Sequence, residues 1–123
     1  MANKDMLILE NQAVIDTEVG LKLAGGNQDL AIDLLNQIVT TLPENLQNIK
    51  ALAAKNDEIG LLHAVHKLHG AICYIGTPRL KTLLTILESE LKKHIMESSL
   101  SLIVQLEHEV SLLLEHHSRL KSA

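Results

Sequence analysis

The chain has 123 residues, the size of one small domain, and a formal net charge of −4. It contains no Trp or Phe and a single Tyr, although 46% of its residues are hydrophobic, so its core must be aliphatic. Binding to nucleic acid, which needs a basic surface and often stacking aromatic residues, is therefore not expected. The single cysteine, Cys73, excludes an internal disulfide and fits a reducing compartment.

The first segment, residues 1–14, mixes Asn, Lys, Asp and Gln with scattered aliphatic residues and is predicted to be a linker or a frayed start. The domain itself is predicted over residues 15–121. Asp16 or Thr17 can cap a short helix that runs to about Ala24, where two consecutive glycines end it.

A long helix is predicted from the cap at Asn27 to about Lys55, because apolar residues recur there at helical spacing. Pro43 interrupts this segment, since proline removes one backbone hydrogen bond and clashes with the carbonyl of Val39. The apolar spacing continues across the proline. This favours one kinked helix over two helices that meet.

The next helix is predicted to start after the cap at Asn56 and Asp57 and to end at Tyr74 or Ile75, with Gly76 as the residue that follows it. At about 100° per residue, its apolar side chains fall within one arc of the helix, which we expect to be buried. These residues are Leu61, Ala64, Val65, Leu68, Ala71, Ile72 and Ile75.

His66 lies about 160° from the centre of this arc and should be exposed to water. Gly70 follows it by one turn, although glycine in an exposed helix interior costs about 1 kcal/mol relative to alanine. A side chain at that position would crowd the imidazole. The bare backbone therefore leaves room for another molecule beside His66.

Two further helices complete the chain. Thr77 and Pro78 combine a capping hydroxyl with proline at the first helical position, and a stripe of leucines then continues to about Lys93. Ser98 or Ser99 is predicted to open the last helix, whose apolar stripe includes His117. Four sizeable amphipathic helices with short connections predict an all-α fold. We expect an antiparallel up-down four-helix bundle with a short additional N-terminal helix that closes one end.

The run His66, Lys67, Leu68, His69, Gly70, Ala71, with Gly76 ten positions after His66, resembles the signature of histidine-containing phosphotransfer (HPt) domains. That signature is roughly H-x-x-K-G followed by a small residue on a bundle helix. The resemblance extends over the helices of residues 16–121. It implies a phosphorelay intermediate in two-component signalling. His66 would accept a phosphoryl group from the aspartyl phosphate of a receiver domain and pass it to the aspartate of a response regulator.

The residues are consistent with this chemistry. A free imidazole has a pKa of about 6.5 and is mostly neutral, hence nucleophilic, at neutral pH. Phosphoryl transfer depends mainly on positioning and charge neutralisation, and the chain contains no P-loop or kinase-type glycine loop for ATP. We therefore expect a phosphoryl carrier that is not itself a kinase and has no cofactor of its own, with Mg²⁺ supplied by the partner.

The resemblance also implies where the domain acts. Its partners would be the receiver domains of a hybrid sensor kinase and of a response regulator, and the domain itself would be a monomer. It would form the cytoplasmic C-terminal part of a sensor kinase of the inner membrane. The sequence contains no signal-peptide pattern and no uninterrupted apolar run of about 20 residues, so we expect no membrane contact by the domain itself.

One position departs from the HPt pattern, because His69 stands where the signature has lysine. An imidazole is shorter than a lysine side chain and only partly protonated. Charge support for the phosphoryl group could come from His69, or from Lys67, which is about 100° away on the helix. Arg79 and Lys81 could approach only from the neighbouring helix. The sequence leaves these choices open.

Other interpretations remain beside this one. The domain could be a non-catalytic helical adaptor or dimerisation module, which explains the leucine stripes but not Gly70. His63, His66 and His69 could bind a metal, although His63 and His69 are about 240° apart on the helix, so such a site would be strained. Cys73 is interpreted as a small filler. Ile59 and Leu62 either form part of a docking patch or are covered by a neighbouring helix.

Overall fold

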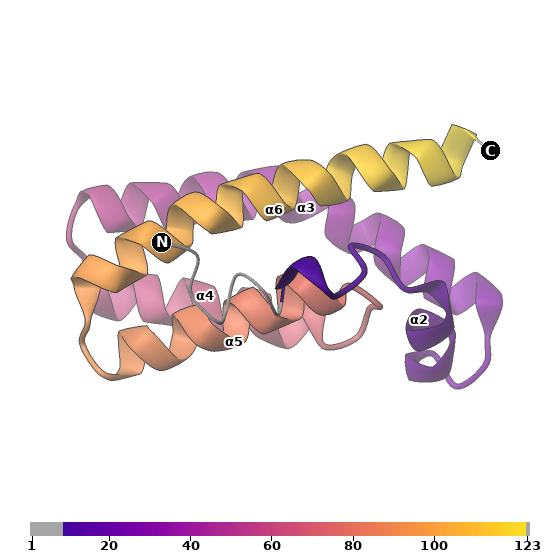
Figure 1. The fold of residues 1–123 in the computed structure, drawn as a ribbon, viewed down its shortest axis with the longest axis horizontal. Helices are drawn as coiled ribbons and strands as arrows, with labels where there is room; N and C mark the ends of the chain where they lie inside the picture. Colours follow the sequence, from indigo (N-terminus) through magenta and orange to yellow (C-terminus); the bar gives the residue numbers. More distant parts are fainter. Residues whose placement is uncertain (1–8, 123) are drawn as a thin grey trace.

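The computed structural model describes residues 9–122, and within that range the chain forms helices and no strands. The helices are α2 (Thr17–Leu23), α3 (Gln28–Ala54), α4 (Glu58–Ile72), α5 (Pro78–Lys92) and α6 (Met96–Ser122). Helices α3 to α6 each pack on the next in chain order, and α6 closes the ring against α3 (Figure 1). The predicted four-helix bundle with a short additional helix is confirmed.

The bundle is built from two long and two short helices. Helices α3 and α6 have 27 residues each, whereas α4 and α5 have 15. One end of the α3–α6 pair therefore projects beyond α4 and α5, and α2 lies beneath this projecting part (Figure 1). Helix α2 contains no buried residue.

Three helices begin at the caps that the sequence predicts. Asp16 Oδ1 accepts hydrogen bonds from the backbone N–H groups of Glu18 and Val19, both at 3.1 Å. Asn27 Oδ1 accepts from Leu30 N–H at 3.0 Å, and Asp57 Oδ1 accepts from Gly60 N–H at 2.9 Å. Each cap satisfies backbone donors that a helix leaves unpaired at its start.

Pro43 lies inside α3, which continues through it as one helix. The two-helix alternative is therefore excluded. The buried residues of α3 lie from Val39 to Ala53, so Pro43 falls within the part of the helix that packs in the bundle.

The starts of α5 and α6 differ from the prediction. Thr77 occupies the cap position of α5, but its hydroxyl makes no capping bond and is buried without a hydrogen-bond partner in the described part of the chain. Helix α6 begins at Met96, before the predicted Ser98 or Ser99. Ser99 Oγ instead donates to the carbonyl oxygen of Ile95 at 2.6 Å, a contact typical of serine within a helix.

The N-terminal segment was predicted to be a linker or a frayed start over residues 1–14. Residues 1–8 lie outside the described range, and for residues 9–14 the prediction is wrong. The Leu9 side chain is 2% exposed and belongs to the core. Thr82 Oγ1 donates to Gln12 Oε1 at 2.8 Å, and Arg79 N–H donates to the carbonyl oxygen of Ala13 at 3.4 Å. These contacts tie the segment to α5.

Gly76 has a different purpose from the one predicted. Helix α4 ends at Ile72, and Gly76 is not in the left-handed conformation that a helix-ending glycine adopts. A Cβ atom on Gly76 would lie 2.1 Å from the carbonyl oxygen of Asp16 and 2.6 Å from the Gly20 nitrogen. Asp16 N–H also donates to the Gly76 carbonyl at 2.8 Å. Gly76 therefore allows the start of α2 to approach the α4–α5 turn.

The core is aliphatic, as the composition predicts. Its most deeply buried apolar side chains come from α3, α4, α5 and α6 and are Leu42, Ile49, Leu61, Val65, Ile72, Leu83, Leu84, Leu87, Leu106 and Leu113. Among residues 9–122, no helix has both the length and the apolar character needed to cross a membrane.

Candidate functional site

His66 projects from the side of α4 that faces water, and its side chain is 69% exposed. The opposite side of the same helix is buried through Leu61, Val65 and Leu68. The predicted exposure of His66 is confirmed, because the apolar spacing of α4 fixes which face packs on the bundle.

The surface beside His66 is open at Gly70. Apart from its chain neighbours and the backbone of its own helix, a Cβ atom built on Gly70 would have no atom within 4 Å. Along the same helix, Ile59 is 86% exposed, and Tyr74 just beyond its end is 65% exposed. Leu62 is half-buried and packs against the core. Of the two apolar residues considered for a docking patch, Ile59 is therefore free and Leu62 is largely covered.

Glu88 on α5 is the site residue that the sequence analysis missed. Its side chain is 9% exposed. Oε1 and Oε2 lie 3.2 and 3.3 Å from His66 Nδ1, and Oε2 accepts from Lys92 Nζ at 2.9 Å. A signal for it was present, because Glu88 follows Leu84 and Leu87 on the buried stripe of α5 and has a lysine one turn later.

The surroundings keep Glu88 ionised. Burial alone raises the pKa of this carboxyl group, but hydrogen bonds from Lys92, His69 and His66, together with the charge of Lys92, lower its pKa to about 2. An ionised carboxylate only accepts hydrogen bonds. His66 Nδ1 must therefore carry a proton to bind Glu88, and Nε2 is the ring nitrogen left for chemistry.

His69 lies at the edge of the core, with its side chain 21% exposed. Its Nδ1 is 3.1 Å from Glu88 Oε1 and its Nε2 is 3.0 Å from Thr85 Oγ1. Both ring nitrogens are thus engaged with α5, and His66 and His69 share one carboxylate oxygen. This answers in part what the sequence left open, because His69 contacts the residue that holds His66.

The other candidate cations lie differently. The Lys67 side chain is exposed and makes no hydrogen bond or ion pair with residues 9–122. Arg79 is engaged elsewhere, because its Nε and Nη2 donate to the Glu109 carboxylate at 3.0 and 2.5 Å. Lys81 is exposed on α5. Lys92, which was not considered from the sequence, is the cation that contacts Glu88.

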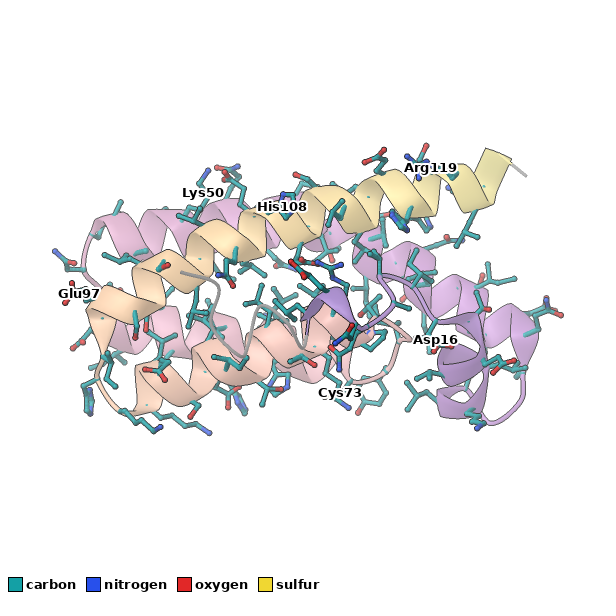
Figure 2. All side chains as sticks on the ribbon, viewed as in Figure 1. Asp16, Lys50, Cys73, Glu97, His108 and Arg119 are labelled. Atoms are coloured by element: carbon teal, nitrogen blue, oxygen red, sulfur yellow. The ribbon has the colours of Figure 1, made fainter. Side chains whose placement is uncertain are left out.

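The metal alternative receives no support from the geometry. His63 is exposed on the outer face of α4 and does not share the Glu88 carboxylate with His66 and His69. Across the part of the chain that the structure describes, no group of three or more His, Cys, Asp or Glu side chains is arranged to hold a metal ion. Cys73 is a free, half-buried thiol at the end of α4, on the side of the molecule away from Lys50 and His108 (Figure 2).

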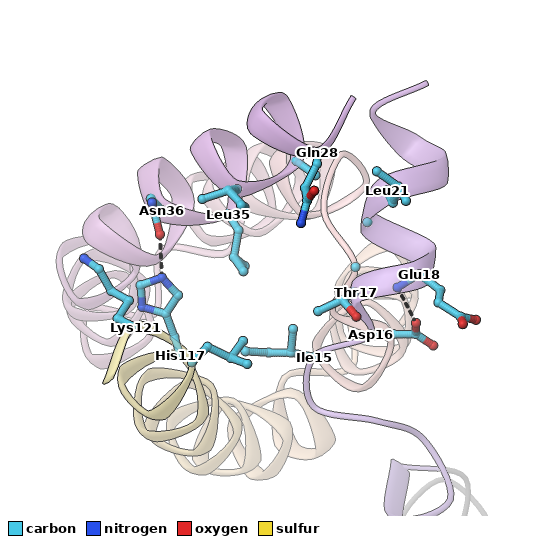
Figure 3. Close-up of a pocket in the computed structure, with 15 residues that line it drawn as sticks. Ile15, Asp16, Thr17, Glu18, Leu21, Gln28, Leu35, Asn36, His117 and Lys121 are labelled. Carbon is cyan, nitrogen blue, oxygen red and sulfur yellow. Dashed lines mark hydrogen bonds between the residues drawn. The ribbon is translucent and has the colours of Figure 1, made fainter. Parts of the chain in front are cut away.

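A cavity of about 620 Å³ lies at the end of the bundle where α3 and α6 project beyond α4 and α5, between α2, α3 and α6 (Figure 3). His117 lies in its wall, with Nε2 2.7 Å from Asn36 Oδ1. Burial and the nearby charge of Lys121 lower the pKa of His117, which favours its neutral form. His117 is buried, as its position on the apolar stripe of the last helix predicts. The cavity contains none of the side chains that surround His66.

Comparison with known proteins finds one family. A family model described as "Hpt domain" matches residues 33–116. The sensor histidine kinase GacS of Pseudomonas protegens is 41% identical over 80 residues, which cover 65% of this chain and 9% of GacS. The signal transduction histidine-protein kinase BarA of Shigella flexneri is 33% identical over 94 residues, which cover 76% of this chain and 10% of BarA. The chain thus spans about a tenth of the length of these relatives.

Solved structures with the same fold carry similar descriptions. The HPT domain of an Hpt sensor hybrid histidine kinase from Shewanella superposes with a TM-score of 0.81 at 29% identity, over 89% of this chain and 94% of that domain. The histidine-containing phosphotransfer protein HptB of Pseudomonas aeruginosa PAO1 has a TM-score of 0.77 at 22% identity, over 89% of this chain and 95% of that protein. The second likeness is evidence for the fold alone.

Proposed function

The chain belongs to the Hpt domain family, and on this premise we propose that it is a phosphorelay intermediate that carries a phosphoryl group on His66. The donor is the aspartyl phosphate of a receiver domain, and the acceptor is the aspartate of a response regulator. The observation that carries the proposal is the exposed His66 ring, held by buried Glu88 through Nδ1 and open to a partner beside Gly70.

The geometry supports Nε2 as the attacking atom. Its lone pair attacks the phosphorus of the aspartyl phosphate, an N–P bond forms, and the P–O bond to the aspartate breaks and returns a carboxylate. Because Nδ1 keeps its proton, the ring becomes positively charged as the new bond forms. The Glu88 carboxylate, 3.2 Å from Nδ1, stabilises that charge.

The same contact supports the onward step. When the aspartate of the next receiver attacks the phosphorus, the N–P bond breaks and its electron pair returns to Nε2. The ring leaves as a neutral imidazole that still donates from Nδ1 to Glu88. One hydrogen bond therefore serves both directions of transfer, as a carrier requires.

The partner supplies what this chain lacks. We propose that the receiver domain brings Mg²⁺ and most of the charge that neutralises the phosphoryl oxygens, and that this domain acts as a monomeric carrier without ATP hydrolysis of its own. Gly70 and the exposed side chain of Ile59 would lie under the docked receiver. We further propose a cytoplasmic location as the C-terminal part of a sensor kinase.

The test is phosphoryl transfer from a receiver domain carrying a ³²P-labelled aspartyl phosphate. Wild type and the control His108→Gln, at an exposed position on α6, should become labelled, and His66→Gln should not. Equal labelling of His66→Gln and wild type would end the proposal. In that case, partner binding that survives without transfer would favour the adaptor alternative.

A further inference from the structure

The protonation of His69 follows from counting the protons in its hydrogen bonds. Thr85 Oγ1 donates its one proton to the carbonyl oxygen of Lys81 at 2.8 Å. The contact of 3.0 Å between Thr85 Oγ1 and His69 Nε2 then requires a proton on Nε2. On the other side of the ring, Nδ1 is 3.1 Å from Glu88 Oε1, which only accepts. Both ring nitrogens therefore face acceptors.

We propose that His69 is held as a doubly protonated imidazolium, a fixed positive charge one turn after His66. It occupies the position where the HPt signature has lysine. His69 does not contact the phosphoryl group. It acts as a positioning residue, because it fixes the Glu88 carboxylate that orients His66, and its charge favours the arriving anion. The effect on transfer rests on the proposed function, whereas the protonation of His69 does not.

The ionisable group in direct contact with His69 is Glu88, whose carboxylate is shared by Lys92 and His66. The carboxylate stabilises a proton on His69, whereas the positive charge of Lys92 opposes it. Helix α3, which also packs on α4, contributes no ionisable side chain in contact with His69 among the described residues. A neutral His69 would require the Thr85 hydroxyl to turn away from Lys81 and leave that carbonyl without its second hydrogen bond.

A consequence separates this chain from one with lysine at position 69. Imidazole can lose its proton near neutral pH, whereas the ammonium group of lysine keeps it. The ratio of the transfer rates of His69→Lys and wild type should therefore change with pH.

The first measurement is ¹⁵N NMR of the ring nitrogens in the unphosphorylated domain near neutral pH. His69 should show the pattern of two protonated nitrogens, and His66 the pattern of a neutral ring protonated at Nδ1. Thr85→Val removes the acceptor for Nε2 on an exposed side chain, so it should shift His69 towards the neutral ring at the same pH. A His69 with one protonated nitrogen in wild type would overturn the proposal.

The second measurement is the rate of labelling by a phosphorylated receiver as a function of pH. His69→Gln should slow transfer by about tenfold, His69→Lys should restore the rate with a different dependence on pH, and His108→Gln on α6 should match wild type. A His69→Gln variant as fast as wild type would refute the role in transfer. If wild type shows the imidazolium but accepts no phosphoryl group, the proposed function fails while the protonation of His69 stands.

Discussion

Gly76 and Gly70 allow a sharp test of what a glycine does in this fold. Replacing Gly76 with alanine would place a carbon atom 2.1 Å from the Asp16 carbonyl oxygen and 2.6 Å from the Gly20 nitrogen. Non-bonded heavy atoms pack at roughly 3.5 Å, so the two backbone segments would have to move apart by about 1 Å or more. That movement would also break the hydrogen bond of 2.8 Å between Asp16 N–H and the Gly76 carbonyl.

The magnitude follows from these two losses. Overpacking costs about 1–3 kcal/mol and the lost hydrogen bond about 1 kcal/mol, which together lower the free energy of unfolding by about 2–4 kcal/mol. For a domain of this size, the melting temperature should fall by about 10 °C. Phosphoryl transfer at low temperature should persist, because His66 and Glu88 lie on α4 and α5 away from this contact.

Thermal and urea unfolding followed by circular dichroism measure the effect, with Gly70→Ala as the matched control. Outside its chain neighbours and the backbone of α4, no atom lies within 4 Å of a Cβ atom on Gly70, and alanine is favoured over glycine within a helix by about 1 kcal/mol. Gly70→Ala should therefore be at least as stable as wild type. A Gly76→Ala variant with wild-type stability, or an equal loss in both variants, would refute the close-approach argument.

Three other outcomes are expected. The pKa of Glu88 is lowered from 4.5 to about 2 in the folded state. The ionised carboxylate therefore adds about 3 kcal/mol to the free energy of unfolding above pH 4.5, and this stabilisation is lost as the pH falls through 2. Between these pH values, wild type should lose more stability in urea unfolding than Glu88→Gln; parallel curves would contradict this. Gly70→Gln should keep the melting temperature but block labelling, because its side chain fills the space a receiver needs, and a normal rate would exclude that role. Glu109→Gln removes a buried carboxylate and leaves the half-buried Arg79 without its ion-pair partner, which should cost about 3 kcal/mol, against less than about 1 kcal/mol for the more exposed Glu107→Gln; equal losses would show that burial does not matter here.

Features set by local spacing could be predicted from the sequence. The caps at Asp16, Asn27 and Asp57, the continuous α3 and the exposure of His66 all depend on residues within one or two turns of each other. Periodicity fixes the buried face of a helix and hence the opposite, exposed face. The class of fold followed from four such faces with short connections.

Features set by contacts between distant segments could not be predicted. The packing of Leu9 and the close approach of Gly76 to α2 depend on how the chain returns to the bundle. Glu88 reaches His66 only because of the register of α5 against α4, which no single-helix pattern fixes. The start of α6 was misplaced for a local reason, because Ser99 binds the Ile95 carbonyl and does not cap.

Because the helices differ in length, the cavity and the cluster of His66, His69 and Glu88 lie in different parts of the molecule. At about 1.5 Å per residue, α3 and α6 are roughly 18 Å longer than α4 and α5. The overhang carries α2 and the cavity, whereas His66, His69 and Glu88 belong to the hairpin of α4 and α5. The overhang is therefore a suitable place for an engineered attachment point, because no described residue of it contacts His66, His69 or Glu88.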